Sequence, residues 1–231
     1  MAIVITYIFN FNQPDKKVYE LHFDEETMNY LPQEEIPDQE WIRLDHCKCS
    51  HCPLDSKAHK YCPVAADLHQ VATHFAPDKS FKEMNVGIKT EDRSYLKTVP
   101  LQDALHSIFG LIMATAGCPH MEFFKSMARF HLPFATYNET IVRALSMYLI
   151  NQYFRSKKGL KPDWELVGLE RIYSNVNTLN KDFIRRLRTI SQGDADKNAI
   201  VMLDTYSSLL AIDIESNFTE IEKLVSFKQI I

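Results

Sequence analysis

The chain has 231 residues, of which 45% are hydrophobic, and its formal net charge at pH 7 is -4. This length suits one large domain or two small ones, and the hydrophobic fraction is sufficient to bury a core without disulfides. A mildly acidic chain lacks the positive charge typical of proteins that bind nucleic acid or anionic membranes. We therefore expect neither as a partner, whereas a protein partner is possible.

The first hundred residues carry two hairpin patterns. Residues 3–11 and 17–23 alternate apolar and polar side chains, are rich in β-branched and aromatic types, and flank a turn signal at 12–15. Residues 84–99 repeat the pattern around a polar turn at 90–92, whereas the acidic, proline-broken stretch 32–40 is typical of a loop. The sequence predicts two β-hairpins here.

Helical spacing dominates the rest of the chain. Thr136 and Glu139 form a capping-box pair at the start of one predicted helix, and Asp163 is the expected N-cap of the next. The predicted helices cover 63–75, 101–116, a segment between Pro119 and Pro133, one from Thr136, one after Pro162, one over 196–212 and an amphipathic stretch at 217–227.

Strands followed by helices indicate the α+β class. We expect N-terminal β-hairpins with a cysteine-rich metal knuckle, and a C-terminal half that is a bundle of about five helices. The expected division is a β-rich part at 1–100, containing the cysteine-rich segment 46–63, and a helical part at 101–231. The two parts could also form one integrated domain.

Four of the five cysteines lie in the segment 46–63, HCKCSHCPLDSKAHKYCP. Cys49 and Cys52 have the spacing of a metal knuckle, and Cys62 follows after nine residues. The first residues lack the basic region of a secretory signal, so we expect a cytoplasmic protein, in which clustered cysteines bind metal more often than they form disulfides. Zinc is the favoured metal; the spacing matches no standard ferredoxin run, which makes an iron–sulfur cluster less favoured.

Two cysteines precede a proline at the expected start of a helix, namely Cys62 and Cys118. Proline is favoured at the first helical position, so each cysteine becomes the N-cap and faces free backbone amides. This position is expected to lower the pKa of the thiol and to favour a metal ligand or a reactive group. We favour Cys118 as the fourth ligand; the alternatives are Cys47, whose spacing to Cys49 strains chelation of one ion, and His51, with His46 and His59 further back.

A second group of candidate residues surrounds Cys118. His120 and His131 could act as a general base or as metal ligands, although a histidine that fixes a buried corner is the plainer interpretation of His131. Glu139 and Arg143 are four residues apart and suggest an ion pair on a helix surface. The basic run at 184–188 is interpreted as a solvated helix face.

Several of these motifs together resemble a known family. CSHCPL, YCPVAADL, GLIMATAGCP, MARFHLPFA, ETIVRALSMYLINQYF and KPDW, in this order, are similar to an uncharacterised bacterial domain of unknown function with a Cys-x2-Cys-Pro-Leu motif. The resemblance covers nearly the whole chain and implies a bacterial cytoplasmic protein without an assigned activity. It also draws attention to the cysteines inside the matching motifs, which are Cys49, Cys52, Cys62 and Cys118.

The sequence therefore predicts a zinc-stabilised binding or regulatory module. The alternative is an iron–sulfur redox protein, or a thiol-dependent enzyme that uses Cys118 with His120 or His131. No phosphate-binding loop, nucleophile elbow or zinc-protease motif accompanies these residues, so whether the protein is an enzyme, and on what substrate, stays open.

Overall fold

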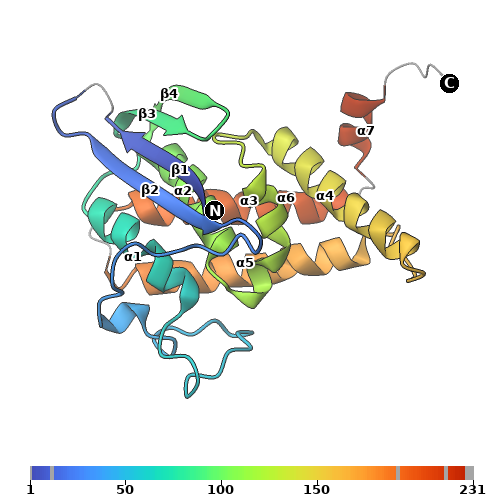
Figure 1. Cartoon of the computed structure of the whole chain (residues 1–231), viewed down its shortest axis with the longest axis horizontal. Coiled ribbons are helices and arrows are strands. Elements are labelled where there is room, and N and C mark those ends of the chain that lie inside the picture. Colours follow the sequence, from blue (N-terminus) through green and yellow to red (C-terminus); the bar gives the residue numbers. More distant parts are fainter. Residues whose placement is uncertain (1, 11–12, 191–192, 216–217, 227–231) are drawn as a thin grey trace.

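Four antiparallel strands form one sheet in the order β2-β1-β3-β4 (Figure 1). The computed structural model describes residues 2–10, 13–190, 193–215 and 218–226. The strands are β1 (Ala2–Phe9), β2 (Lys17–Asp24), β3 (Glu83–Lys89) and β4 (Ser94–Pro100). Both predicted hairpins are confirmed, although residues 11 and 12 of the first one lie outside the described residues. The α+β class is confirmed as well.

Strand β1 lies inside the sheet because it pairs with strands from both hairpins. Tyr7 lies opposite Tyr19 of β2 and opposite Ile88 of β3. Alternate residues of β1, namely Ile5, Tyr7 and Phe9, are buried on one face. A strand places successive side chains on opposite faces, so this alternation fixes which face of the sheet meets the helices.

Seven α-helices and two short 3-10 helices are described. Their bounds are η1 Glu40–Ile42, α1 Pro63–Phe75, α2 Leu101–Thr115, η2 Pro119–Phe124, α3 Lys125–Arg129, α4 Tyr137–Lys157, α5 Val167–Leu187, α6 Ala195–Glu215 and α7 Thr219–Val225. The predicted capping box at Thr136 is present. The last predicted stretch, 217–227, corresponds to α7, and its two end residues lie outside the described part of the chain.

Two helix predictions were wrong in detail. The segment after Cys118 begins as the 3-10 helix η2 and only then becomes the short α3. Helix α5 begins at Val167, later than predicted, because Leu166 takes a left-handed backbone conformation (φ 61°) at its start. Asp163 still serves this helix, since its Oδ2 accepts the amide hydrogen of Gly168 over 2.7 Å.

Helix α2 is the central helix of the fold. Eleven of its fifteen residues are buried, so it is covered all round rather than on one stripe. It packs against α6, and α6 in turn packs along α5 (Figure 1). Among the described residues, no helix is both long and apolar enough to cross a bilayer. The apolar composition of α2 is therefore explained by its place in the core.

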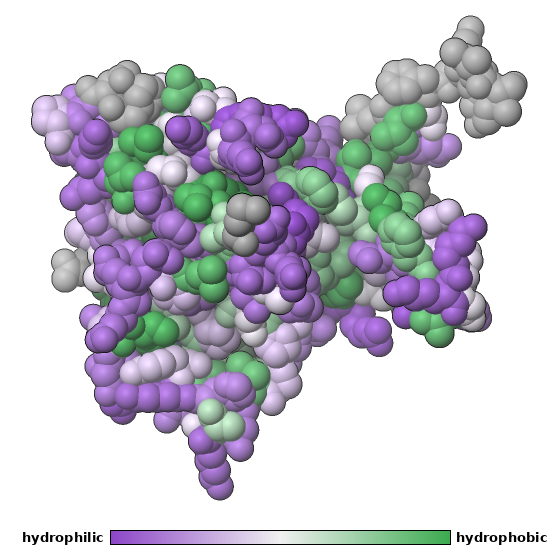
Figure 2. Space-filling model, viewed as in Figure 1, coloured by the Kyte–Doolittle hydropathy of each residue, from purple (hydrophilic) through white to green (hydrophobic). Residues whose placement is uncertain are grey.

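The larger hydrophobic core contains residues of the sheet together with residues of α1, α2, α5 and α6. A second, smaller core joins α4 to α5, with Ile141, Tyr148 and Leu169 among its members. On the face seen in Figure 2, hydrophilic residues cover much of the surface, and apolar residues form separate patches between them. The cysteine-rich loop extends from the larger core, beside α5.

Candidate functional site

The cysteine-rich segment is a loop closed at its base. The amide of Cys62 donates a hydrogen bond to the carbonyl of Ile42 over 2.9 Å, which brings together the two ends of the loop 43–61. Further along, the amide of Cys52 donates to the carbonyl of Cys49 over 3.0 Å. This turn brings Cys49 and Cys52 to the same part of the loop.

Cys62 and Cys118 are the N-cap residues that the sequence predicted. Cys62 precedes α1 and Cys118 precedes η2, each with proline at the first helical position. The amides two and three residues further on face each sulfur and lower the pKa of its thiol. Neither sulfur accepts a cap hydrogen bond of normal geometry, so the interaction is electrostatic.

The charges of the four predicted ligands affect one another's pKa. Burial raises the pKa of the Cys49 thiol to about 12, and the nearby charges of Cys62, Asp182 and Cys118 raise it further. Cys52 in turn raises the pKa of Cys62 and of Cys118. Cys62 is part of the larger hydrophobic core and Cys49, Cys52 and Cys118 pack against it, so the fold brings cysteines from three separate segments to the same core.

The expected fall in thiol pKa was wrong. Burial raises the pKa of Cys62, and it raises that of Cys118 to about 12, even though the helix amides act in the opposite direction. The increase in pKa caused by burying the thiolate is larger than the decrease caused by the helix amides. A thiol in this state is protonated at neutral pH and is a poor nucleophile.

Helix α5 holds the tip of the loop. The carboxylate of Asp182 accepts hydrogen bonds from the amide of Ser50, over 2.6 Å, and from its hydroxyl, over 3.0 Å. The Nε2 of His51 donates to the carbonyl of Asn175 over 3.0 Å. The residues between Cys49 and Cys52 are thus tied to a long, well-packed helix.

His51 also contacts the segment that carries Cys118. Its ring stacks on that of His120 with the ring centroids 4.0 Å apart, and Nε2 of His120 donates to the carbonyl of His51 over 3.1 Å. The Nδ1 atom of His51 is buried without a protein partner among the described residues. A histidine that donates through one nitrogen and leaves the other free has the arrangement of a metal ligand, so His51 remains an alternative to a cysteine.

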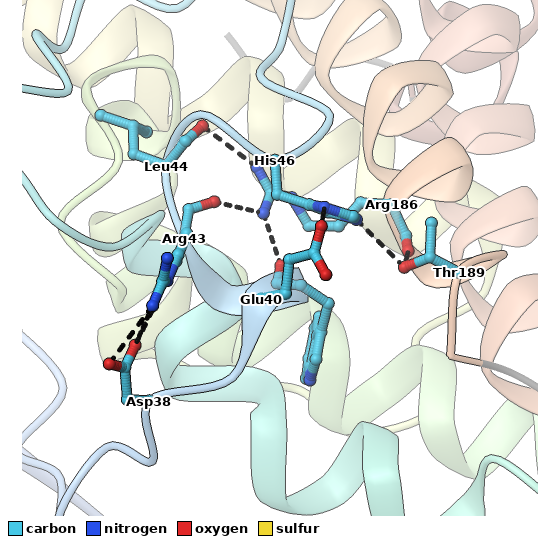
Figure 3. Close-up of polar contacts among 8 residues, drawn as sticks. Asp38, Glu40, Arg43, Leu44, His46, Arg186 and Thr189 are labelled. Atoms are coloured by element: carbon cyan, nitrogen blue, oxygen red, sulfur yellow. Dashed lines mark hydrogen bonds and ion pairs between the residues drawn. The ribbon is translucent and has the colours of Figure 1, made fainter.

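A buried arginine lies beside the cysteines. Arg186 of α5 is only 1% exposed, and its charge lowers the pKa of Cys49 and Cys62. Its guanidinium donates to three backbone carbonyls at the base of the loop, at 2.5, 2.7 and 3.4 Å (Figure 3). They belong to Trp41 of η1 and to Arg43 and Leu44. None of the ion pairs formed within the described ranges includes Arg186.

The interpretation of residues 184–188 as a solvated face was therefore wrong for Arg186. Its neighbour Arg185 fits that interpretation better, since its side chain is 59% exposed and pairs with Asp182. His46, one of the alternative ligands, lies between Glu40 and Thr189, at 3.5 and 3.2 Å (Figure 3). These contacts connect the base of the loop to η1 and to the segment that follows α5.

The cysteines are close but do not form a ready-made chelate. Among residues 2–10, 13–190, 193–215 and 218–226, no group of three or more histidine, cysteine, aspartate or glutamate side chains is arranged to hold a metal ion. The five cysteines are free thiols. The cysteine-rich metal knuckle therefore stays a prediction, and metal binding would need the side chains to close around the ion.

The second group of candidate residues, around Cys118, does not form one site in the structure, because His131 makes its contacts elsewhere. His131 lies at the sheet, where its Nε2 is 2.6 Å from the hydroxyl of Tyr7, and that hydroxyl is 2.9 Å from Oγ of Ser107. Burial lowers the pKa of His131 to about 3. This is the corner-fixing role, and it leaves His131 engaged with groups other than Cys118.

The ion pair expected between Glu139 and Arg143 is not among those of the described residues. Glu139 instead accepts from the amide and hydroxyl of Thr136 in the capping box, at 2.7 and 2.8 Å. Arg143 donates through Nη2 to the carbonyls of Met127 and Phe130, at 2.6 and 2.9 Å. The arginine is drawn inward, away from the helix surface.

Two residues of the region were missed by sequence reasoning, namely Asp182 and Arg186. A signal was present, because Arg186 follows Leu179 by seven residues and Phe183 by three, which places it on the buried stripe of α5. A charged residue on the buried face of a helix seldom lacks a partner. The position of Arg186 in the sequence therefore indicated that a group able to pair with it lies nearby.

A family model described as "Domain of unknown function (DUF6901)" matches residues 5–226. The chain belongs to this uncharacterised family, as its motifs suggested. No curated protein and no solved structure matches it.

Proposed function

We propose that the protein is a zinc-stabilised binding or regulatory module, with Cys49, Cys52, Cys62 and Cys118 as the metal ligands. Four cysteines at suitable separations are the usual ligand set of a structural zinc site. A closed site with four protein ligands leaves no open coordination position, and this favours a structural role over catalysis.

The observation that carries the proposal is the buried charge of Arg186 beside two of the four thiols, those of Cys49 and Cys62. A buried cation without an anionic partner is unfavourable. Zn²⁺ bound by four thiolates is an anion, because the four negative charges exceed the two positive charges of the ion. The zinc centre would give Arg186 the counter-charge that the described carboxylates do not supply.

The thiols themselves support the same conclusion. As free groups, Cys49 and Cys118 resist ionisation because burial raises their pKa. A bound zinc ion reverses that preference, since its charge deprotonates coordinating thiols outright. The metal would then join the loop tip, the start of α1 and the start of η2, three segments that share no regular hydrogen-bonded element.

The thiol-enzyme alternative has less support. His131 is engaged with Tyr7, and the Nε2 of His120 is engaged with a backbone carbonyl. Neither contact positions a base to activate Cys118, whose raised pKa already opposes reaction. An iron–sulfur cluster uses the same four ligands and is separated from zinc by the experiment below.

The test is elemental analysis of anaerobically purified protein, together with its visible spectrum. We expect about one zinc per chain and no colour. Single Cys→Ser changes at positions 49, 52, 62 and 118 should each strongly reduce the zinc content. Cys47→Ser is the matched control, since it removes a thiol of the same loop that is not a proposed ligand, and it should retain the metal.

Three results would contradict the proposal. Iron with sulfide and a broad visible band would replace zinc by a cluster. Equal metal loss in Cys47→Ser would mean that the loop responds to any lost thiol. Full zinc content in Cys118→Ser would remove Cys118 from the site and favour His51.

A further inference from the structure

We infer that the cavity between α2, η2, α5 and α6 binds a small carboxylate with a ring-sized apolar body and a hydrogen-bond donor at its far end. The cavity volume is about 150 Å³. A cavity of this volume holds one aromatic ring, so the ring of the ligand would fill it and its two polar groups would lie against the polar side chains of the wall. Most of its wall is apolar and includes Leu111, Met121, Phe124, Met127, Val176 and Leu203.

Three buried polar atoms on the wall of this cavity have no protein partner in the described chain. They are the hydroxyl of Tyr173, Oδ1 of Asn180 and Nε2 of His106. Tyr173 is 4% exposed and Asn180 is 0% exposed. Buried polar groups are nearly always hydrogen-bonded, so three unpartnered ones around one apolar cavity indicate a ligand that completes them.

The polar groups are separated along α5. Tyr173 and Asn180 are seven residues apart, which is about two helical turns and roughly 10 Å of rise on the same face. Val176, which also lines the cavity, lies between them. A ligand that meets both groups therefore needs polar atoms at opposite ends of an apolar ring.

The charge of Arg143 identifies the end that carries the carboxylate. Arg143 lines the cavity, and the described ion pairs do not include it. Burial lowers its pKa, and the neighbouring Tyr173 acts in the opposite direction, so guanidinium and hydroxyl lie near each other. Its protein hydrogen bonds use Nη2 alone, which leaves Nη1 to donate a charge-assisted hydrogen bond to a carboxylate.

The end of the cavity at Asn180 would accept a hydrogen bond from a donor group of the ligand. Asn180 presents an oxygen there, because its Nδ2 lies 3.5 Å from Oγ of Ser207. Burial lowers the pKa of His106 to about 4, so this wall is uncharged. A phenolic hydroxyl fits this end, where it would donate to Asn180. A 4-hydroxybenzoate-like molecule combines the two ends.

The cavity is separate from the proposed metal centre. None of the five cysteines lines it, and the inference does not require zinc. Two elements serve both regions. Helix η2 begins after Cys118 and contributes Met121 and Phe124 to the cavity wall, and α5 carries Arg186 near the cysteines and Tyr173 and Asn180 at the cavity.

The test is a calorimetric titration of the full-length protein with 4-hydroxybenzoate, phenol and toluene as separate probes. Phenol lacks the carboxylate, and toluene lacks both polar ends. We expect 4-hydroxybenzoate to bind at least about tenfold more tightly than phenol, since a charge-assisted hydrogen bond is stronger than a neutral one. Toluene should bind more weakly still.

Tyr173→Phe removes the hydroxyl and keeps the ring, and it should weaken 4-hydroxybenzoate binding about tenfold. Tyr19→Phe is the matched control, because it also removes a buried, unpartnered hydroxyl, but one that lies outside this cavity. The control should bind as the unchanged protein does. Should Tyr173→Phe fail to fold, the comparison of 4-hydroxybenzoate with phenol decides the matter alone.

No detectable binding of any probe at millimolar concentration would overturn the inference and leave water as the partner of the polar groups. Equal affinity for phenol and 4-hydroxybenzoate would overturn the role of Arg143. An equal loss of affinity in Tyr19→Phe and Tyr173→Phe would mean that the probes bind elsewhere.

Discussion

Replacing Arg186 by methionine tests the relation between the buried cation and the metal. Methionine keeps much of the side-chain length but removes the charge and the hydrogen bonds to the loop carbonyls. Two of those bonds are short, at 2.5 and 2.7 Å, and the third is weak, at 3.4 Å. Charge-assisted bonds contribute about 1.5–3 kcal/mol each, so the two short ones amount to about 3–6 kcal/mol.

Without metal, part of this loss is offset in the Arg186→Met variant. The variant no longer buries an uncompensated charge, and burying such a charge costs several kcal/mol. The net destabilisation of the metal-free protein should therefore be small, about 0–2 kcal/mol. In the zinc-loaded protein Arg186 faces an anionic centre, and its removal should cost about 3–5 kcal/mol, as for other broken buried pairs.

The assay is urea unfolding of both proteins, once with zinc and once with a chelator. Arg185→Met is the control, because this side chain is 59% exposed and Asp182 keeps its hydrogen bonds from Ser50 without it, so the change should cost about 1 kcal/mol under either condition. Equal destabilisation of Arg186→Met with and without zinc would refute the reasoning, since the arginine would then serve the loop alone.

Three further predictions concern the stability of the fold. Burial raises the pKa of Asp67 from 3.8 to about 7, so the folded protein retains a proton that the unfolded chain loses, and stability should decrease by about 2–4 kcal/mol between pH 4 and 7. Asp67→Asn should abolish this decrease in urea titrations across that range; an unchanged pH profile would show that the carboxyl is well hydrated. Thr136→Val removes the capping box with Glu139 and should cost about 1–2 kcal/mol in thermal unfolding, whereas no change would mean that α4 does not depend on its cap. Gly193→Ala places a methyl group against the backbone carbonyl of Asp78 and should cost more than about 2 kcal/mol in urea unfolding; a fully stable variant would contradict that close approach.

Local patterns predicted the elements because their causes are local. The alternation along β1 and β2 reflects one buried face of a hairpin, and the capping box at Thr136 is a contact between residues three apart. The N-cap position of Cys62 follows from the proline after it. In each case the stabilising partner lies within a few residues of the signal.

The rest depends on contacts that are distant in sequence. Nothing near β1 indicates that it pairs with β3, some eighty residues away. The raised pKa of Cys118 comes from burial that only the assembled fold provides, and this reversed the expectation drawn from its N-cap position. Arg186 was assigned to the surface by its charge, whereas its place on the apolar stripe of α5 decides its burial.

The measurement that tests the central claim most directly is X-ray absorption at the zinc edge of the purified full-length protein. We expect one shell of four sulfur atoms at about 2.3 Å. Three sulfurs with one nitrogen at about 2.0–2.1 Å would contradict the four-cysteine site and point to His51 in place of one cysteine. A shell of nitrogen and oxygen alone, or the absence of bound zinc, would contradict the metal-stabilised module as a whole.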